Sequence, residues 1–299
     1  MLSKRTAGIT FSLVTLIAAG CAVFEADDGR PWRAVSDTRI AGFAFPESVG
    51  CDPDGKVLYV SQFGGTELKP AEKDGNGFIS KVGLDGKVIE QRAFDVKLNK
   101  PKGIWIEGGR LWVTDIDSVW IFDLASKKGR RLEIPGIQFA NDPAVQGGVL
   151  FVSDNRSDQL FRVEPADFLD AKVQPKVSAA WSKKTINPNG VWPARDGTLL
   201  IGGFMSADQP RGIHAMAKDG SLKAVTQPIG RIDGLYEMRD GSLLATDWGS
   251  GSLFHWSAKG GKQDLAKDFK GPADFCVMGD MVYVPDLPAS QVRIIRLGK

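Results

Sequence analysis

Six positions along the chain each precede a short apolar segment, and four of them carry a side-chain oxygen. They recur with a period of roughly 40 to 50 residues and are Glu47, Lys102, Asn141, Asn189, Asp233 and Ala273. Carboxylate and carboxamide oxygens are the ligands that Ca²⁺ and Mg²⁺ prefer. A fold that gathers these positions would therefore create a cation site. The alternative is that Asn189-Gly190 and Asp233-Gly234 are ordinary turn residues.

Other kinds of catalytic or binding site find little support. The two histidines, His214 and His255, fall inside apolar segments, which disfavours a Ser/His/Asp or Cys/His arrangement. The sequence has neither the paired Cys or His residues typical of zinc sites nor a glycine-rich phosphate loop. The formal net charge is +2 and no basic block occurs. We therefore expect no nucleic-acid partner.

The elements that must position these residues repeat six times. Each repeat centres on a short apolar run that ends in a polar or small residue, and the runs are 57–62, 110–115, 149–154, 198–203, 242–247 and 281–286. Further apolar segments lie before and after each run. A period of roughly 40 to 50 residues with strand-like segments alone is typical of a propeller. We predict an all-β, six-bladed β-propeller whose six aligned positions converge on one mouth of the central channel.

Closure of this ring needs a strand from elsewhere. The sixth blade ends at Lys299 after its third strand, which would leave an unpaired edge. We predict that residues 32–40 supply the missing strand; the alternative is a disordered tether. Four of the six runs end in an aspartate (Asp115, Asp154, Asp247 and Asp286), for which we predict a side-chain cap rather than a second metal site. The insertion 62–76 is expected on the mouth face, as a lid or as a solvated loop.

The order Glu47, Asn141-Asp142, Asn189-Gly190 and Asp233-Gly234 resembles that of the gluconolactonase/regucalcin (senescence-marker-protein) family, over residues 42–299. The resemblance implies one divalent cation, usually calcium, bound by Glu47, Asn189 and Asp233. It also implies that Asn141 assists metal or substrate binding and that Asp233 is the acid/base. Members of the family hydrolyse lactones or organophosphates.

The implied chemistry is coherent, although two residues depart from the family pattern. A bound cation would polarise a lactone carbonyl, and Asp233 would take a proton from the attacking water. Phe139 stands where many members carry a substrate-contacting arginine, which favours an apolar substrate. Lys102 would place a positive charge near the cation, unless it points outward or contacts an anionic substrate.

Part of the sequence favours a different class of function. The segment from Val284-Pro285-Asp286 through Arg293-Ile294 is similar to blades of NHL-type propellers, which bind partners rather than catalyse. A non-enzymatic binding module or scaffold in the cell envelope is therefore the alternative to a hydrolase of small molecules.

The amino terminus carries export signals. Lys4 and Arg5 precede the apolar run 9–19, a pattern typical of a secretory signal and too short for a stable membrane span. The sequence Ala18-Ala19-Gly20-Cys21 resembles a bacterial lipobox. We predict a signal peptide at 1–20, a tether at 21–31 and a propeller at 32–299. The protein would be a monomer held on the periplasmic side of a membrane by a lipid on Cys21, or alternatively a soluble periplasmic protein.

The other two cysteines, Cys51 and Cys276, fall on the inner strands of blades one and six. An oxidising compartment would permit a disulfide. The repeat alignment offsets the two positions by one residue, so we expect their side chains on opposite faces of their strands. This geometry predicts two buried free cysteines rather than a bridge.

Overall fold

A computed structural model describes residues 30–182 and 184–299, whose regular secondary structure consists of antiparallel strands and one short 3₁₀ turn. The predicted signal peptide and the lipidation site at Cys21 lie outside the described residues. No helix in the described ranges has the length and hydropathy needed to cross a membrane.

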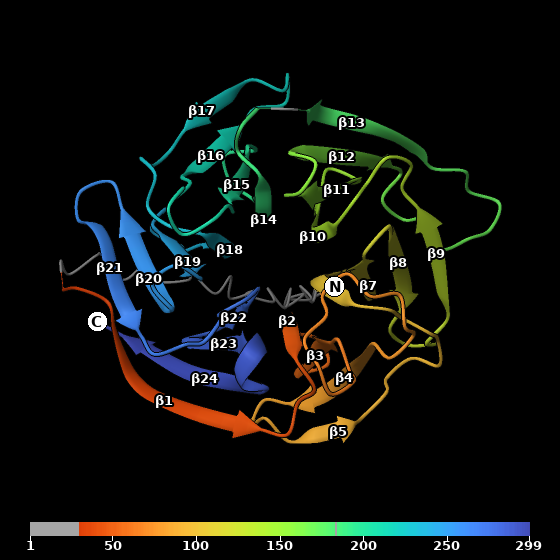
Figure 1. Cartoon of the computed structure of the whole chain (residues 1–299), viewed down its shortest axis with the longest axis horizontal. Helices are drawn as coiled ribbons and strands as arrows, with labels where there is room; N and C mark the ends of the chain where they lie inside the picture. The colour runs from red at the N-terminus through yellow and green to blue at the C-terminus, as the bar shows by residue number, and fades with distance from the viewer. Residues whose placement is uncertain (1–29, 183) are drawn as a thin grey trace, which may run out of the picture. The chain divides into compact units, whose positions relative to one another are not determined.

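Residues 31–299 form six four-stranded sheets around a common axis, which confirms the predicted six-bladed β-propeller (Figure 1). Blades one to three contain β2 (Pro46–Asp52), β3 (Val57–Gln62), β4 (Phe78–Gly83), β5 (Val88–Glu90); β6 (Pro101–Glu107), β7 (Arg110–Asp115), β8 (Ser118–Asp123), β9 (Gly129–Glu133); and β10 (Ala140–Gln146), β11 (Val149–Asp154), β12 (Gln159–Glu164), β13 (Lys176–Ser182). Blades four and five contain β14 (Pro188–Pro193), β15 (Leu199–Gly203), β16 (Ile213–Met216), β17 (Leu222–Ala224); and β18 (Ile232–Glu237), β19 (Leu243–Asp247), β20 (Ser252–Ser257), β21 (Gly261–Ala266). Blade six contains β22 (Cys276–Met278), β23 (Met281–Asp286), the 3₁₀ turn Leu287–Ala289, β24 (Gln291–Gly298) and, from the start of the chain, β1 (Arg33–Ala41).

The first strand of the described chain closes the ring, as predicted. β1 pairs antiparallel with β24, from Arg33 opposite Gly298 to Ala41 opposite Gln291. Arg293 on β24 is 2% exposed, and its guanidinium bonds the Asp37 carboxylate of β1 and the Lys267 carbonyl. The buried charge is thus neutralised by the strand that completes the blade.

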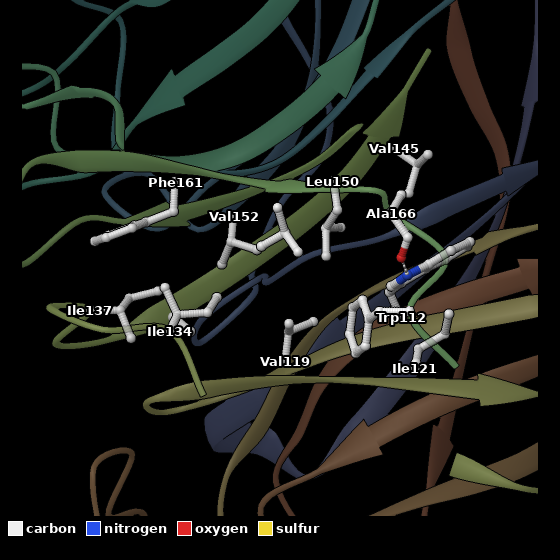
Figure 2. Close-up of a cluster of buried hydrophobic side chains, with 13 residues drawn as sticks. Trp112, Val119, Ile121, Ile134, Ile137, Val145, Leu150, Val152, Phe161 and Ala166 are labelled. Carbon is white, nitrogen blue, oxygen red and sulfur yellow. Dashed lines mark hydrogen bonds between the residues drawn. The ribbon is translucent and has the colours of Figure 1, made fainter. Parts of the chain in front are cut away.

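Apolar side chains fill the space between neighbouring blades. Figure 2 shows the cluster between blades two and three, where Val119 and Ile121 of β8 face Leu150 and Val152 of β11. The indole N–H of Trp112 in the same cluster donates to the Ala166 carbonyl at 2.9 Å. This packing holds the blades face to face and keeps the inner strands around the axis.

Contrary to expectation, Cys51 and Cys276 form a disulfide across the seam between blades one and six, with Cα atoms 5.7 Å apart. A Cβ on Gly50 would lie 2.4 Å from Ile104 of blade two, so strand alternation turns Cys51 toward blade six. Phe275 packs on Gly234 of blade five, which turns Cys276 toward blade one. Where two neighbouring blades meet, one blade contributes the side chains on one face of its sheet, and the other blade contributes those on the opposite face of its own sheet. The offset of one residue therefore permits the bridge, and the prediction of free cysteines is wrong.

This disulfide predicts a simple thiol count. A chain beginning at Arg30 contains Cys51 and Cys276 as its only cysteines. It should show no reactive thiol when denatured without reductant, and two after reduction. Because the bridge closes a very long loop, the Cys51→Ser/Cys276→Ser variant should lose roughly 4–5 kcal/mol of unfolding free energy in urea titrations. Two thiols before reduction would contradict the assignment.

Candidate functional site

The six aligned positions occupy equivalent places at the start of the inner strands. In five blades the residue is the second of its strand, immediately after a residue paired with the end of the next strand; these are Glu47, Lys102, Asn141, Asn189 and Asp233. The strand register shifts at this point in all five blades. Such a bulge frees residues from the ladder and re-aims their side chains. In blade six the buried Ala273 takes this place, beside Pro272 opposite Asp286.

Hydroxyl groups on the neighbouring strands hold these bulges. The side-chain oxygen of Ser61, Ser153 or Thr246 accepts the N–H that follows the mouth residue, at 2.8–2.9 Å. Thr246 also donates to the carbonyl of Ala273 in the next blade, at 3.1 Å, and Thr114 donates to the carbonyl of Asn141. The hydroxyls therefore fix both the bulge and its distance from the next blade.

The aspartates that end the second strands act as caps, as predicted. Each accepts backbone N–H groups from the loop that enters the inner strand of its own blade: Asp115 from Asn99 and Lys100, Asp154 from Gln138, Asp247 from Arg231, and Asp286 from Lys270 and Gly271. These hydrogen bonds satisfy backbone N–H groups of the loop that have no partner in a β-sheet. They position the entry to four of the six mouth residues.

Buried oxygen atoms without a hydrogen-bond partner gather at this mouth. Among the described residues, six carboxylate or carboxamide side chains have such an atom, and five of them lie here: Glu47, Asn141, Asp142, Asn189 and Asp233. None of the five residues is more than 4% exposed. An unsatisfied buried polar atom costs roughly 1–3 kcal/mol. Their concentration in one place marks a site built for a ligand that supplies positive charge or donors.

The electrostatics of the mouth are dominated by carboxylates. Burial, followed by the charge of a neighbouring carboxylate, raises the pKa of Glu47, Asp142 and Asp233 well above the ordinary values. Burial raises the pKa of Asp274 to about 7. One ammonium accompanies them, because Lys102 interacts with Glu47, and burial lowers the pKa of Lys102 to about 8. Four carboxylates against one ammonium leave the site either protonated or in need of a cation.

Asp142 and Asp274 were not among the predicted site residues. Each follows a mouth position directly: Asp142 lies in the bulge of β10, and Asp274 lies before β22, where it forms a bridge with Ser48 of blade one. Gly103 makes room for Asp142, because a Cβ there would lie 2.5 Å from its Oδ1. Asp274 accepts a hydrogen bond from the Ser48 hydroxyl at 2.6 Å, across the seam between blades six and one. In the sequence, only the Asn141-Asp142 pair of the family resemblance pointed to Asp142 as a site residue, and nothing pointed to Asp274.

The donor set fits a hard divalent cation. Glu47 and Asp233 supply carboxylate oxygens, Asn189 supplies a carboxamide oxygen, and each has one unpartnered atom. The Nδ2 of Asn189 donates to Asp233 Oδ2 at 3.3 Å, which turns the two side chains toward each other. No group of three or more His, Cys, Asp or Glu side chains in residues 30–182 and 184–299 is arranged to enclose a metal. A cation here would therefore depend on the carboxamide oxygen as well as on the carboxylates.

Other residues define the surroundings of the mouth. Lys100, just before β6, bonds Asp74 of the 62–76 insertion at 2.7 Å, so this insertion lies on the mouth side as expected. At the far end of the inner strands, the ring of Trp192 packs edge-on against Trp105 and at a tilt against Tyr236, with centroids 5.4 and 4.6 Å apart. These contacts join blades two, four and five. His214 and His255 lie on the third strands β16 and β20, away from the inner strands, as their apolar segments indicated.

The raised pKa of Asp274 predicts how the cation-free protein responds to pH. A carboxyl with a raised pKa contributes stability below its ordinary pKa of 3.8, and that stability is lost as the pH rises through about 7. In EDTA, the unfolding free energy of the wild type should therefore fall, relative to that of Asp274→Asn, between about pH 5 and pH 8. Urea titrations at several pH values measure this difference. A difference that does not change with pH would contradict the assignment.

Comparison with known proteins supports the fold. No protein-family model matches the sequence, and no curated protein matches it. The structure is similar to a gluconolactonase from Xanthomonas campestris, with 15% identity over 89% of this chain and 91% of that chain and a TM-score of 0.63. A putative gluconolactonase is 15% identical over 90% of this chain and 98% of that chain, with a TM-score of 0.64. A virginiamycin B lyase from Staphylococcus aureus is 14% identical over 89% of this chain and 99% of that chain, with a TM-score of 0.59. At these identities the similarity establishes the propeller fold alone.

Proposed function

We propose that this chain is a Ca²⁺-dependent hydrolase of lactones or other esters, acting at the mouth of the propeller. The observation that carries the proposal is the group of buried, unpartnered oxygens on Glu47, Asn189 and Asp233. Cation binding would satisfy these atoms and offset the excess of carboxylate charge. The similarity to propellers named as gluconolactonases supports the same class of reaction.

The protein's own residues would share the chemistry in a defined way. A bound cation supplies polarisation of the substrate carbonyl and a lowered pKa for water. Asn189 holds Oδ2 of Asp233, which leaves Oδ1 without a partner. That oxygen would accept a proton from the attacking water. Asn141 lies beside the pair in the ring of mouth residues and would orient the substrate.

Calcium should stabilise the folded protein measurably. After EDTA treatment and dialysis, Ca²⁺ at about 100 times its Kd should add about 2.7 kcal/mol to the unfolding free energy. Asp233→Asn should lose this response because it removes one carboxylate ligand. Asp240→Asn is the matched control, since Asp240 caps the turn before β19 in the same blade. Thermal denaturation with and without Ca²⁺ measures the effect. A wild type that responds to no divalent cation would exclude the proposal.

Turnover separates the hydrolase from a binding module. Hydrolysis of at least one lactone or aryl ester should require Ca²⁺ and be lost in Asp233→Asn. A retained thermal response to Ca²⁺ without turnover of any substrate in such a panel would favour the propeller as a metal-stabilised binding module instead.

We also propose that the protein acts in the cell envelope. Disulfides persist in oxidising compartments, and the bridge between Cys51 and Cys276 supports export by the amino-terminal signal. The lipid anchor on Cys21 is tested by mass spectrometry of the mature protein. A diacylated amino-terminal cysteine is expected, and a free thiol at Cys21 would contradict the anchor.

A further inference from the structure

Two cationic side chains lie over one aromatic ring beside the carboxylates of the mouth. Lys102 Nζ is 4.1 Å from the centroid of Phe139, and Arg156 Cζ is 3.8 Å from it. The two charges are therefore within about 8 Å of each other. Phe139 is itself buried, so the ring expected to favour an apolar substrate is instead covered by positive charge.

Lys102 differs from the other buried cations of the described chain. Three cationic side chains there are almost fully buried: Lys100, Lys102 and Arg293. Lys100 bonds the Asp74 carboxylate at 2.7 Å, and Arg293 bonds Asp37. Lys102 donates only to the Lys100 carbonyl, at 3.3 Å, and forms no ion pair among the described residues. Glu47 interacts electrostatically with this ammonium, but no carboxylate of the described residues hydrogen-bonds it, so donors remain for an anionic group of a ligand.

Arg156 has a complementary position nearer to solvent. Its side chain is exposed, and its guanidinium forms no hydrogen bond or ion pair within the described ranges. The five N–H donors of an arginine form a planar fork that matches a carboxylate. Stacking on Phe139 holds this fork in place next to the deeper ammonium.

We propose that Lys102 and Arg156 form a binding site for a carboxylate carried by the substrate. This inference rests on the proposed hydrolase, and it names the substrate class as anionic lactones or esters. The ester end would lie toward Asp233 and Asn189, and the carboxylate would lie over the edge of Phe139. The surrounding carboxylates repel a dianion more strongly than a monoanion, which favours a carboxylate over a phosphate.

A matched pair of ligands tests the charge requirement. γ-Carboxy-γ-butyrolactone carries a carboxylate, and its primary carboxamide is neutral, nearly the same in size and shape, and has the lactone as its only ester. Calorimetric titration into Ca²⁺-equilibrated protein should show tighter binding of the carboxylate by about tenfold or more, because charge-assisted hydrogen bonds are the stronger ones. Arg156→Gln should remove most of this preference, and Arg156→Lys should keep part of it. Arg162→Gln is the control, because Arg162 pairs with Glu164 on β12 of the same blade.

The outcomes separate this inference from the proposed hydrolase. A preference for the carboxylate that depends on Arg156 supports the anion site, whether or not the lactones are hydrolysed. Absence of hydrolysis for both lactones would count against the hydrolase and not against the anion site. Hydrolysis of both lactones at equal kcat/KM, with equal binding, would overturn the anion site and leave the hydrolase standing. An equal loss of binding for both ligands in Arg156→Gln would also overturn it, because it would show a structural role.

Discussion

The position of the side chains at the propeller axis depends on a bulge at the second residue of five inner strands. The bulge takes the mouth residue out of the ladder and brings the residue after it toward the axis as well. Hydroxyls such as Thr246 hold the freed N–H and the carbonyl of the next blade. Such bonds tie the bulges to neighbouring blades, as from Thr114 to Asn141 and from Thr246 to Ala273, and so hold the oxygens of separate strands in one set.

Closure of the ring completes that set. Glu47 belongs to blade one and Asp274 to blade six; the Asp274 N–H donates to the Glu47 carbonyl at 3.2 Å, and the disulfide between Cys51 and Cys276 joins the same two blades. The hydrogen bond from Ser48 to Asp274 crosses the same seam. The excess of carboxylates over ammonium groups then makes a bound cation the simplest way to stabilise the closed mouth. Within this acidic mouth, Lys102 and Arg156 over Phe139 are the cationic groups that we propose as contacts for an anionic substrate.

Much of this arrangement could be predicted from the repeat alone. The recurring apolar runs predicted the blade count, the closing strand and the aligned mouth positions, since all three follow from strand period and edge pairing. Asp274 was not predicted because its place at the mouth depends on a bridge to Ser48 of the neighbouring blade, which an alignment of the repeats does not show. The disulfide was not predicted because side chains on opposite faces of equivalent strands were expected to point away from each other. Across the seam between two neighbouring blades, these are the faces that meet. The contact of Arg156 with Phe139 depends on turn geometry that no local pattern encodes.

The most direct test of the cation site is a crystal structure of the protein grown with Ca²⁺, with anomalous data. We expect one anomalous peak at the mouth, with oxygens of Glu47, Asn189 and Asp233 at roughly 2.3–2.6 Å. Density for water alone at the mouth, with the carboxylates hydrogen-bonded to one another, would contradict it.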